Sequence, residues 1–141
     1  GIEFVLISPD ELQLPGYLKK GILSSDNLKY TETTDLEAVM PSLDILYMTR
    51  VQRERFTDLM EYERVKDSYL LCNRMLRKAK PNMKILHPLP RLNEINIDVD
   101  SNPHAYYFEQ AHNGLFARQA LICDVLNIGL EQILNDNTII D

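Results

Sequence analysis

Arg50 and Gln52 are the first residues whose types and spacing could bind a ligand. They follow directly on Ile45–Met48, an apolar run that is typical of a buried strand. Side chains two residues apart in an extended segment project to the same side, so a guanidinium and an amide can converge on one small molecule. Because a guanidinium matches a carboxylate through two parallel hydrogen bonds, the pair predicts a carboxylate subsite. The alternative is a solvated charge run of Arg50, Arg53, Glu54 and Arg55. A salt bridge from Glu54 to Arg50 would be a structural use of the arginine that also pre-positions its fork.

The second candidate is the string His87-Pro88-Leu89-Pro90, which follows the apolar run at residues 83–86. Two prolines remove two backbone donors and leave carbonyl oxygens free to accept hydrogen bonds. Such a turn suits a ligand that offers N–H groups, and an X-Pro bond in so tight a turn can be cis. The alternative is a plain turn that ends a strand.

The elements that must position these strings alternate between strand and helix signals, which is typical of an α/β domain with a parallel sheet. Open parallel sheets bind ligands at the carboxyl ends of their strands, so we expect residues 50–52 and 88–90 to meet at one edge. The predicted strands lie at residues 4–7, 28–31, 45–49, 69–71 and 83–87.

Helix starts support this alternation. Ser8-Pro9-Asp10-Glu11 and Thr34-Asp35-Leu36-Glu37 both match a capping box. Further helices are predicted from Thr57 through Asp58–Lys66, from Asn73 through Arg74–Lys80, and from Asn102-Pro103 into His104–Gln110.

A long helix is predicted from Asn113 through Leu126, and it is apolar around much of its circumference. Helices of this kind are normally covered on more than one face. The sequence predicts only a few short strands to pack against this helix, so we expect another domain or chain to cover part of it. The chain also begins almost inside its first predicted strand, so we expect a segment to precede it.

The totals indicate one domain with a real core, since 141 residues carry 45% hydrophobic content. A net charge of −6 argues against nucleic acid or an anionic membrane surface as partner. No apolar stretch approaches the roughly 18 residues that cross a bilayer. Cys72 and Cys123 lie far apart without metal-ligand spacing, which indicates two buried thiols in a reducing, cytoplasmic setting.

Asp98, Asp100, Asn102 and Glu109 occupy positions one, three, five and twelve of an EF-hand loop. The sixth position needs a glycine for its sharp turn, and Pro103 stands there with its φ angle locked. The segment is therefore interpreted as an acidic turn, and we expect neither a metal site nor a cofactor.

Both strings belong to longer segments, and two further segments follow them along the chain. The four segments are Asp44–Gln52 (DILYMTRVQ), Lys84–Ile95 (KILHPLPRLNEI), Asp98–Phe108 (DVDSNPHAYYF) and Asn113–Leu121 (NGLFARQAL). They closely resemble aspartate carbamoyltransferases, enzymes of pyrimidine biosynthesis, and the likeness extends from about Phe4 to Leu126. Ornithine carbamoyltransferases typically have Cys at the position of Pro88 and lack the T-R-V-Q string, so they are a more distant alternative.

The resemblance implies roles for both strings. Arg50 would grip the side-chain carboxylate of L-aspartate, assisted by Gln52. Backbone groups of Pro88, Leu89 and Pro90 would receive the amino group of carbamoyl phosphate and guide the attacking amine, with a cis Leu89-Pro90 bond. A mobile loop over residues 51–66, including Glu54, Glu61 and Tyr62, would close over the substrates. It assigns no catalytic side chain within this chain.

The implied fold is a Rossmann-like, three-layer domain with a parallel sheet that lacks its first strand-helix unit. It would comprise an α/β core at about residues 1–112 and a C-terminal helical segment at about 113–135 that packs on a missing N-terminal carbamoyl-phosphate domain. The family's phosphate-binding S-x-R-T motif is not in this sequence. The family further implies a catalytic homotrimer with possible regulatory chains.

Two functional hypotheses follow. In the first, the chain is the aspartate-binding part of a carbamoyltransferase and is inactive alone. In the second, it is a non-catalytic α/β binding or interaction module that keeps the fold without the chemistry.

Overall fold

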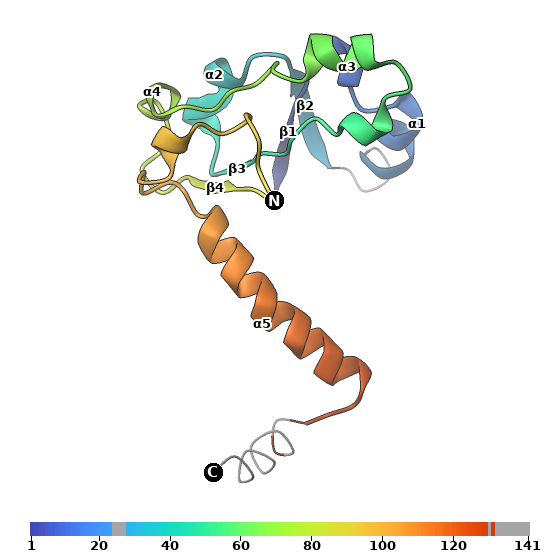
Figure 1. Ribbon diagram of the computed structural model, residues 1–141, viewed down its shortest axis with the longest axis vertical. Coiled ribbons are helices and arrows are strands. Elements are labelled where there is room, and N and C mark those ends of the chain that lie inside the picture. The colour runs from blue at the N-terminus through green and yellow to red at the C-terminus, as the bar shows by residue number, and fades with distance from the viewer. Residues whose placement is uncertain (24–27, 130, 132–141) are drawn as a thin grey trace.

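Two parallel strand pairs form the centre of the molecule, and one long helix projects from it (Figure 1). The structure is a computed structural model in which residues 1–23, 28–129 and 131 are described. Short helices surround the strands, and the chain passes from the last strand through a turn-rich segment into the long helix α5 (Tyr107–Val125). The parallel α/β class predicted from the sequence is confirmed.

The strands pair in two separate ladders. β1 (Glu3–Ile7) lies parallel to β2 (Lys29–Thr33), and β3 (Ile45–Tyr47) lies parallel to β4 (Lys84–Leu86). The bond from the Met48 N–H to the Leu86 carbonyl extends the second ladder by one rung, at 2.9 Å. The ends of β3 and β4 therefore lie side by side.

The core is built around the second ladder. Its strand residues Leu46 and Ile85 are buried, and fully buried residues from other segments, including Met40, Leu71 and Tyr107, join the same cluster. Residues on one strand alternate between the two faces, so the residues next to Ile85 along the chain are more exposed. The core fixes the positions at which β3 and β4 end.

Helix caps differ from the predicted capping boxes by small shifts. The Asp35 carboxylate accepts from the Ala38 N–H at 3.0 Å and caps α2 (Leu36–Val39), one residue after the predicted Thr34. Asp58 caps α3 (Leu59–Val65) by accepting from Met60 N–H. The element order also contains α1 (Gly16–Leu18), α4 (Asn73–Leu76) and the single-turn or irregular helices η1 (Asp10–Leu12), η2 (Lys19–Leu23), η3 (Met40–Ser42), η4 (Arg53–Arg55) and η5 (Ile97–Val99).

The helix starts predicted at Ser8 and Asn73 are wrong. Ser8 does not cap a helix, because its N–H extends the first ladder by donating to the Thr33 carbonyl, and only the short η1 follows. Asn73 is not a cap either. It is the first residue of α4, which ends at Leu76 rather than Lys80, and its side-chain amide donates to the Asp98 carbonyl oxygen.

The predicted strand at residues 69–71 is reduced to one parallel bridge, between Leu71 and Ile95. The predicted helix at 104–110 does not start at Pro103, because Ala105 pairs with Ile85 as a short extended segment. The Asn102 side chain instead accepts from the His104 N–H and forms a turn.

The helices predicted on either side of Asn113 form one continuous helix, α5. It leaves the α/β body at its first turns (Figure 1). Apolar side chains are exposed along its length. The exposed set on the helix comprises Phe108, Leu115, Phe116, Leu121, Ile122 and Val125, and Leu126 directly after the helix is exposed as well. No helix in the described residues could cross a membrane. The predicted helical segment at 113–135 includes positions 130 and 132–135, which lie outside the described residues.

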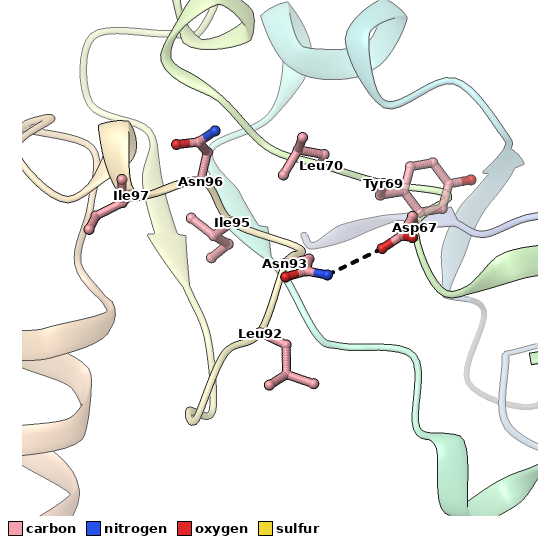
Figure 2. A pocket seen from close by; sticks show the side chains of 8 residues that line it. All are labelled: Asp67, Tyr69, Leu70, Leu92, Asn93, Ile95, Asn96 and Ile97. Carbon is pink, nitrogen blue, oxygen red and sulfur yellow. Dashed lines mark hydrogen bonds between the residues drawn. The ribbon is translucent and has the colours of Figure 1, made fainter. Parts of the chain in front are cut away.

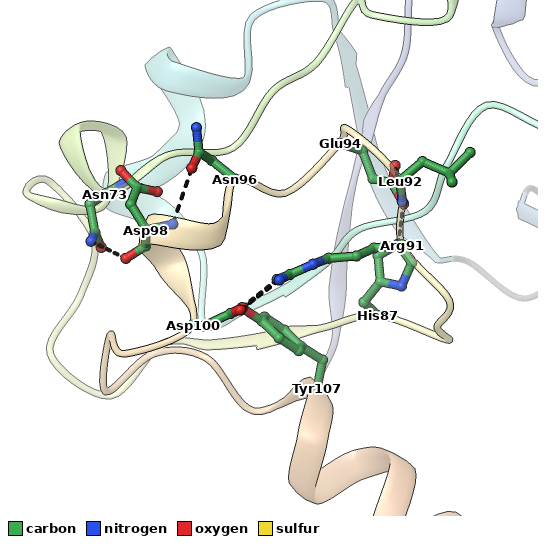
Figure 3. A network of polar contacts seen from close by, with 9 residues as sticks. All are labelled: Asn73, His87, Arg91, Leu92, Glu94, Asn96, Asp98, Asp100 and Tyr107. Carbon is green, nitrogen blue, oxygen red and sulfur yellow. Dashed lines mark hydrogen bonds and ion pairs between the residues drawn. The ribbon is translucent and has the colours of Figure 1, made fainter.

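The start of α5 is held by a polar cluster of the buried Tyr107 and the partly buried Arg91 and Asp100 (Figure 3). The Tyr107 hydroxyl donates to Asp100 at 2.5 Å, and the Arg91 guanidinium donates two hydrogen bonds to the same carboxylate. The Arg91 guanidinium lowers the pKa of Asp100. The Asp98 carboxylate in turn accepts from the Asn73 N–H. Asp98 and Asp100, two carboxylates that an EF-hand would need for calcium, are therefore both bound to protein groups.

Tyr107 makes the fold sensitive to alkaline pH. Burial, followed by the hydrogen bond to Asp100, raises the pKa of Tyr107 to about 12. An unfolded tyrosine ionises near pH 10, so the stabilisation is fully present below pH 10 and is lost as the pH rises toward 12. We expect urea unfolding to show that wild type loses about 2–3 kcal/mol more than Tyr107→Phe between pH 9 and 12. Parallel losses in the two proteins would contradict this assignment.

Candidate functional site

The two predicted strings lie at the same edge of the structure. Because β3 and β4 are parallel neighbours in register, residues 49–52 and 87–90 both leave the carboxyl end of the second ladder. The Arg50 side chain is 33% exposed, so its guanidinium is not sealed in the interior. The arrangement matches the expected ligand-binding edge of an open parallel sheet. The binding roles of Arg50 and Gln52 remain predictions.

Arg50 is held in place by Glu54. The nearest guanidinium nitrogen and carboxylate oxygen are 2.7 Å apart, and a second contact measures 3.4 Å. Hydrogen bonding from its own backbone and then from the Arg50 guanidinium lowers the pKa of Glu54. This confirms the predicted salt bridge. Since Glu54 occupies only part of the guanidinium fork, the remaining donors of Arg50 can bind a ligand carboxylate.

The turn at His87-Pro88-Leu89-Pro90 has a special backbone. The Leu89-Pro90 peptide bond is cis, as the resemblance implies, and Leu89 has a φ angle of 49°. A non-glycine residue in this left-handed region is uncommon and occurs most often where the surroundings force it, for instance at binding sites. The half-buried Leu89 side chain packs against the core and anchors the turn.

Among Pro88, Leu89 and Pro90, only Leu89 has a backbone N–H, and this N–H is bound to the His87 ring. The Leu89 N–H donates to His87 Nδ1 at 2.8 Å. Pro88 and Pro90 have no N–H, so the turn presents only carbonyl oxygens to a ligand. We call Pro88-Leu89-Pro90 the acceptor turn. Its chemistry favours ligands rich in N–H donors, such as an amide or an amine.

The His87 ring is itself held by a second contact, to Glu94. It is 2% exposed, and its Nε2 lies 2.8 Å from a carboxylate oxygen of the buried Glu94 (Figure 3). Because Nδ1 accepts from Leu89, the proton of the ring must be on Nε2, from which it is donated to Glu94. Glu94 also accepts from the Leu92 N–H. The sequence predicted no role for the His87 side chain or for Glu94.

Gln110 is a further polar residue that sequence reasoning missed. It lies in the first turns of α5, and its side-chain oxygen accepts from the His87 N–H at 2.9 Å. It is 23 residues away from His87 in sequence, so no local spacing indicates the contact. Within the described residues, no group of three or more His, Cys, Asp or Glu could hold a metal ion. Cys72 and Cys123 are free but only half-buried, so the prediction that both are buried is wrong.

A surface pocket of about 480 Å³ lies around the bridge between Leu71 and Ile95 (Figure 2). Its polar contact is between the Asn93 amide and Asp67, at 3.5 Å. It contains neither Arg50 nor the acceptor turn. Its lining residues are Asp67, Tyr69, Leu70, Leu92, Asn93, Ile95, Asn96 and Ile97.

Comparison with known proteins shows the family. A sequence model of the Asp/Orn binding domain of aspartate/ornithine carbamoyltransferase matches residues 1–125. The chain belongs to the aspartate/ornithine carbamoyltransferase family. It is 59% identical over 134 residues to the aspartate carbamoyltransferase catalytic subunit of Bacteroides thetaiotaomicron, and 54% identical over 128 residues to that of Lachnoclostridium phytofermentans. These alignments cover 94% and 91% of the chain but only 42% of each relative.

Solved carbamoyltransferase structures share the fold. The catalytic subunit of M. jannaschii aspartate transcarbamoylase superposes with a TM-score of 0.78 at 38% identity, over 90% of this chain and 42% of that one. The Trypanosoma cruzi enzyme in complex with carbamoyl phosphate and aspartate gives 0.76 at 33% identity, over 85% of this chain and 40% of that one. The chain thus spans about two fifths of the length of its relatives, and it corresponds to their Asp/Orn binding part.

Proposed function

We propose that this chain supplies the aspartate side of an aspartate carbamoyltransferase active site. The observation that carries the proposal is the pairing of β3 with β4, which brings a partly exposed arginine fork and a donor-free turn to one edge. A dicarboxylic amino acid offers a carboxylate to the first and an amine to the second. The family of the chain and the related Trypanosoma cruzi structure in complex with carbamoyl phosphate and aspartate support the same assignment.

The reaction forms a bond between nitrogen and carbon and breaks the bond between the carbamoyl carbon and the phosphate oxygen. The α-amine of L-aspartate attacks the carbamoyl carbon, a tetrahedral centre forms, and phosphate leaves. The proton that the amine loses passes to the departing phosphate. Arg50 and Gln52 would orient aspartate through its side-chain carboxylate. Carbonyls of Pro88 and Leu89 would accept from the carbamoyl amino group and the attacking amine. Holding two reactants in one geometry supplies a large part of such rate enhancements.

The exposed face of α5 supports the proposal that a second domain completes the enzyme. A helix this apolar is normally covered, and the body of the protein covers only its first turns. We propose that the carbamoyl-phosphate domain packs there and provides the donors for the phosphate. We propose that the complete protein is a cytoplasmic catalytic homotrimer that can bind regulatory chains.

Complementation tests the proposal. We define the assembled enzyme as this chain together with a carbamoyl-phosphate domain of the same family. Mixing the two should produce N-carbamoyl-L-aspartate at a rate about a hundredfold above either part alone, because each part holds only one reactant. The product can be measured by a colorimetric ureido assay, with L-ornithine as the control substrate. No product from the mixture, with both parts folded, would favour the non-catalytic binding module.

A further inference from the structure

Gln110 connects three elements at the edge where the site lies. Its side-chain oxygen accepts from the His87 N–H at 2.9 Å, and its side-chain nitrogen lies 3.4 Å from the Tyr47 hydroxyl. Tyr47 is the last residue of β3, His87 follows the last residue of β4, and Gln110 itself belongs to α5. One half-buried side chain thus contacts the ends of both strands.

The contact with His87 completes the hydrogen bonding of β4. On one side, β4 pairs with β3. On the other side, the Ile85 N–H donates to the His104 carbonyl at 2.8 Å, and the Ile85 carbonyl accepts from the Tyr106 N–H at 3.0 Å. Amides two residues apart in a strand point the same way, so the His87 N–H faces this second side.

No backbone carbonyl continues the pairing there, because the chain has turned into α5 at Tyr107. A buried N–H without an acceptor is destabilising, and the Gln110 amide oxygen fills the place of the missing carbonyl. The side chain therefore extends the strand pairing by one bond, at the residue that immediately precedes the acceptor turn.

We propose that Gln110 is a positioning residue for carbamoyl transfer, an inference that rests on the proposed function. Two hydrogen bonds flank the Pro88 carbonyl: His87 N–H to Gln110 before it, and Leu89 N–H to His87 Nδ1 after it. Together they fix where the carbonyl oxygens of the acceptor turn point. Gln110 also connects the turn to α5. If the second domain docks on that helix, the contact would therefore fix the position of the acceptor turn relative to the carbamoyl phosphate that the second domain binds.

Three variants of Gln110 test separately whether its function depends on the hydrogen-bond acceptor, on the length of the side chain or on its size. In the assembled enzyme, Gln110→Met keeps the length but removes the acceptor, and we expect kcat to fall about 10- to 100-fold because the reacting groups lose their alignment. Gln110→Asn keeps the amide but shortens it, and should show a similar fall. Gln110→Glu keeps the acceptor and should stay within about threefold of wild type. The KM for aspartate should change less than about twofold in all three, since Arg50 and Gln52 are intact.

The matched control is Gln13→Met, which makes the same chemical change at an exposed residue of the peripheral segment after η1. It should leave kcat and KM unchanged. Rates are divided by the folded fraction from circular dichroism, and Gln110→Asn provides the comparison if Gln110→Met does not fold. Hydrogen exchange of the His87 amide should quicken in the Met and Asn variants and stay protected in the Glu variant.

Three outcomes would overturn the inference while leaving the proposed function standing. They are a wild-type kcat in the Met and Asn variants, an equal loss in the Glu variant, or a loss explained by unfolding alone in every variant. A wild-type assembled enzyme that makes no carbamoyl aspartate would overturn the proposed function, and the inference with it.

Discussion

Replacing Arg50 by Ala should reduce kcat/KM for aspartate by about 30- to 1,000-fold in the assembled enzyme, because a lost bidentate contact to a carboxylate is worth on the order of 2–4 kcal/mol. Glu54 already holds the guanidinium at 2.7 Å, so the fork is oriented before the ligand binds. Arg50→Lys keeps the charge without the planar fork and should fall between wild type and Arg50→Ala.

The matched control for Arg50 is Arg53→Ala, three residues along the chain in η4, where the side chain is exposed. The same loss of charge there should leave aspartate saturation within about twofold of wild type, since a surface charge acts weakly through screened solvent. Binding of carbamoyl phosphate should be unchanged in both variants. Unchanged aspartate saturation and turnover in Arg50→Ala would remove this residue from the site.

Replacing His87 by Leu should destabilise the fold by about 2–4 kcal/mol, the second large effect that we expect. The substitution leaves the Glu94 carboxylate buried without its ring partner and takes the acceptor away from the Leu89 N–H. The free energy of unfolding from urea titration measures the loss. His104→Leu is the control, because that half-buried ring makes one hydrogen bond to the Met83 carbonyl and its loss should be about 1 kcal/mol.

A double-mutant cycle separates the buried charge from the loss of packing. Combining His87→Leu with Glu94→Leu removes both polar partners, and about half of the lost stability should return. Activity should stay low, since the Leu89 N–H would still lack its acceptor and the turn would lose its fixed shape. A double variant as unstable as His87→Leu alone would show that the unpaired carboxylate is not the cause.

Secondary structure was predicted best where neighbouring residues decide it. The runs at 45–48 and 83–86 and the start of α3 depend on periodicity and on a cap within a few residues. The helix starts predicted at Ser8 and at Asn102-Pro103 were wrong because the backbone there hydrogen-bonds to a strand that is distant in sequence. Ser8 pairs with Thr33, and the segment after Pro103 pairs with Ile85. Local propensity is weak against such long-range hydrogen bonds.

The sequence by itself determined the family, the parallel α/β class and the position of the two strings at the carboxyl ends of their strands. Each of these features depends on residues that are contiguous in the sequence. Only the tertiary structure decided how the turn after β4 is held. His87 accepts from Leu89, Glu94 holds the ring, and Gln110 reaches back from α5 across 23 residues. Such contacts exist only once the chain has closed on itself, since a buried donor takes whichever acceptor the packing brings within about 3 Å.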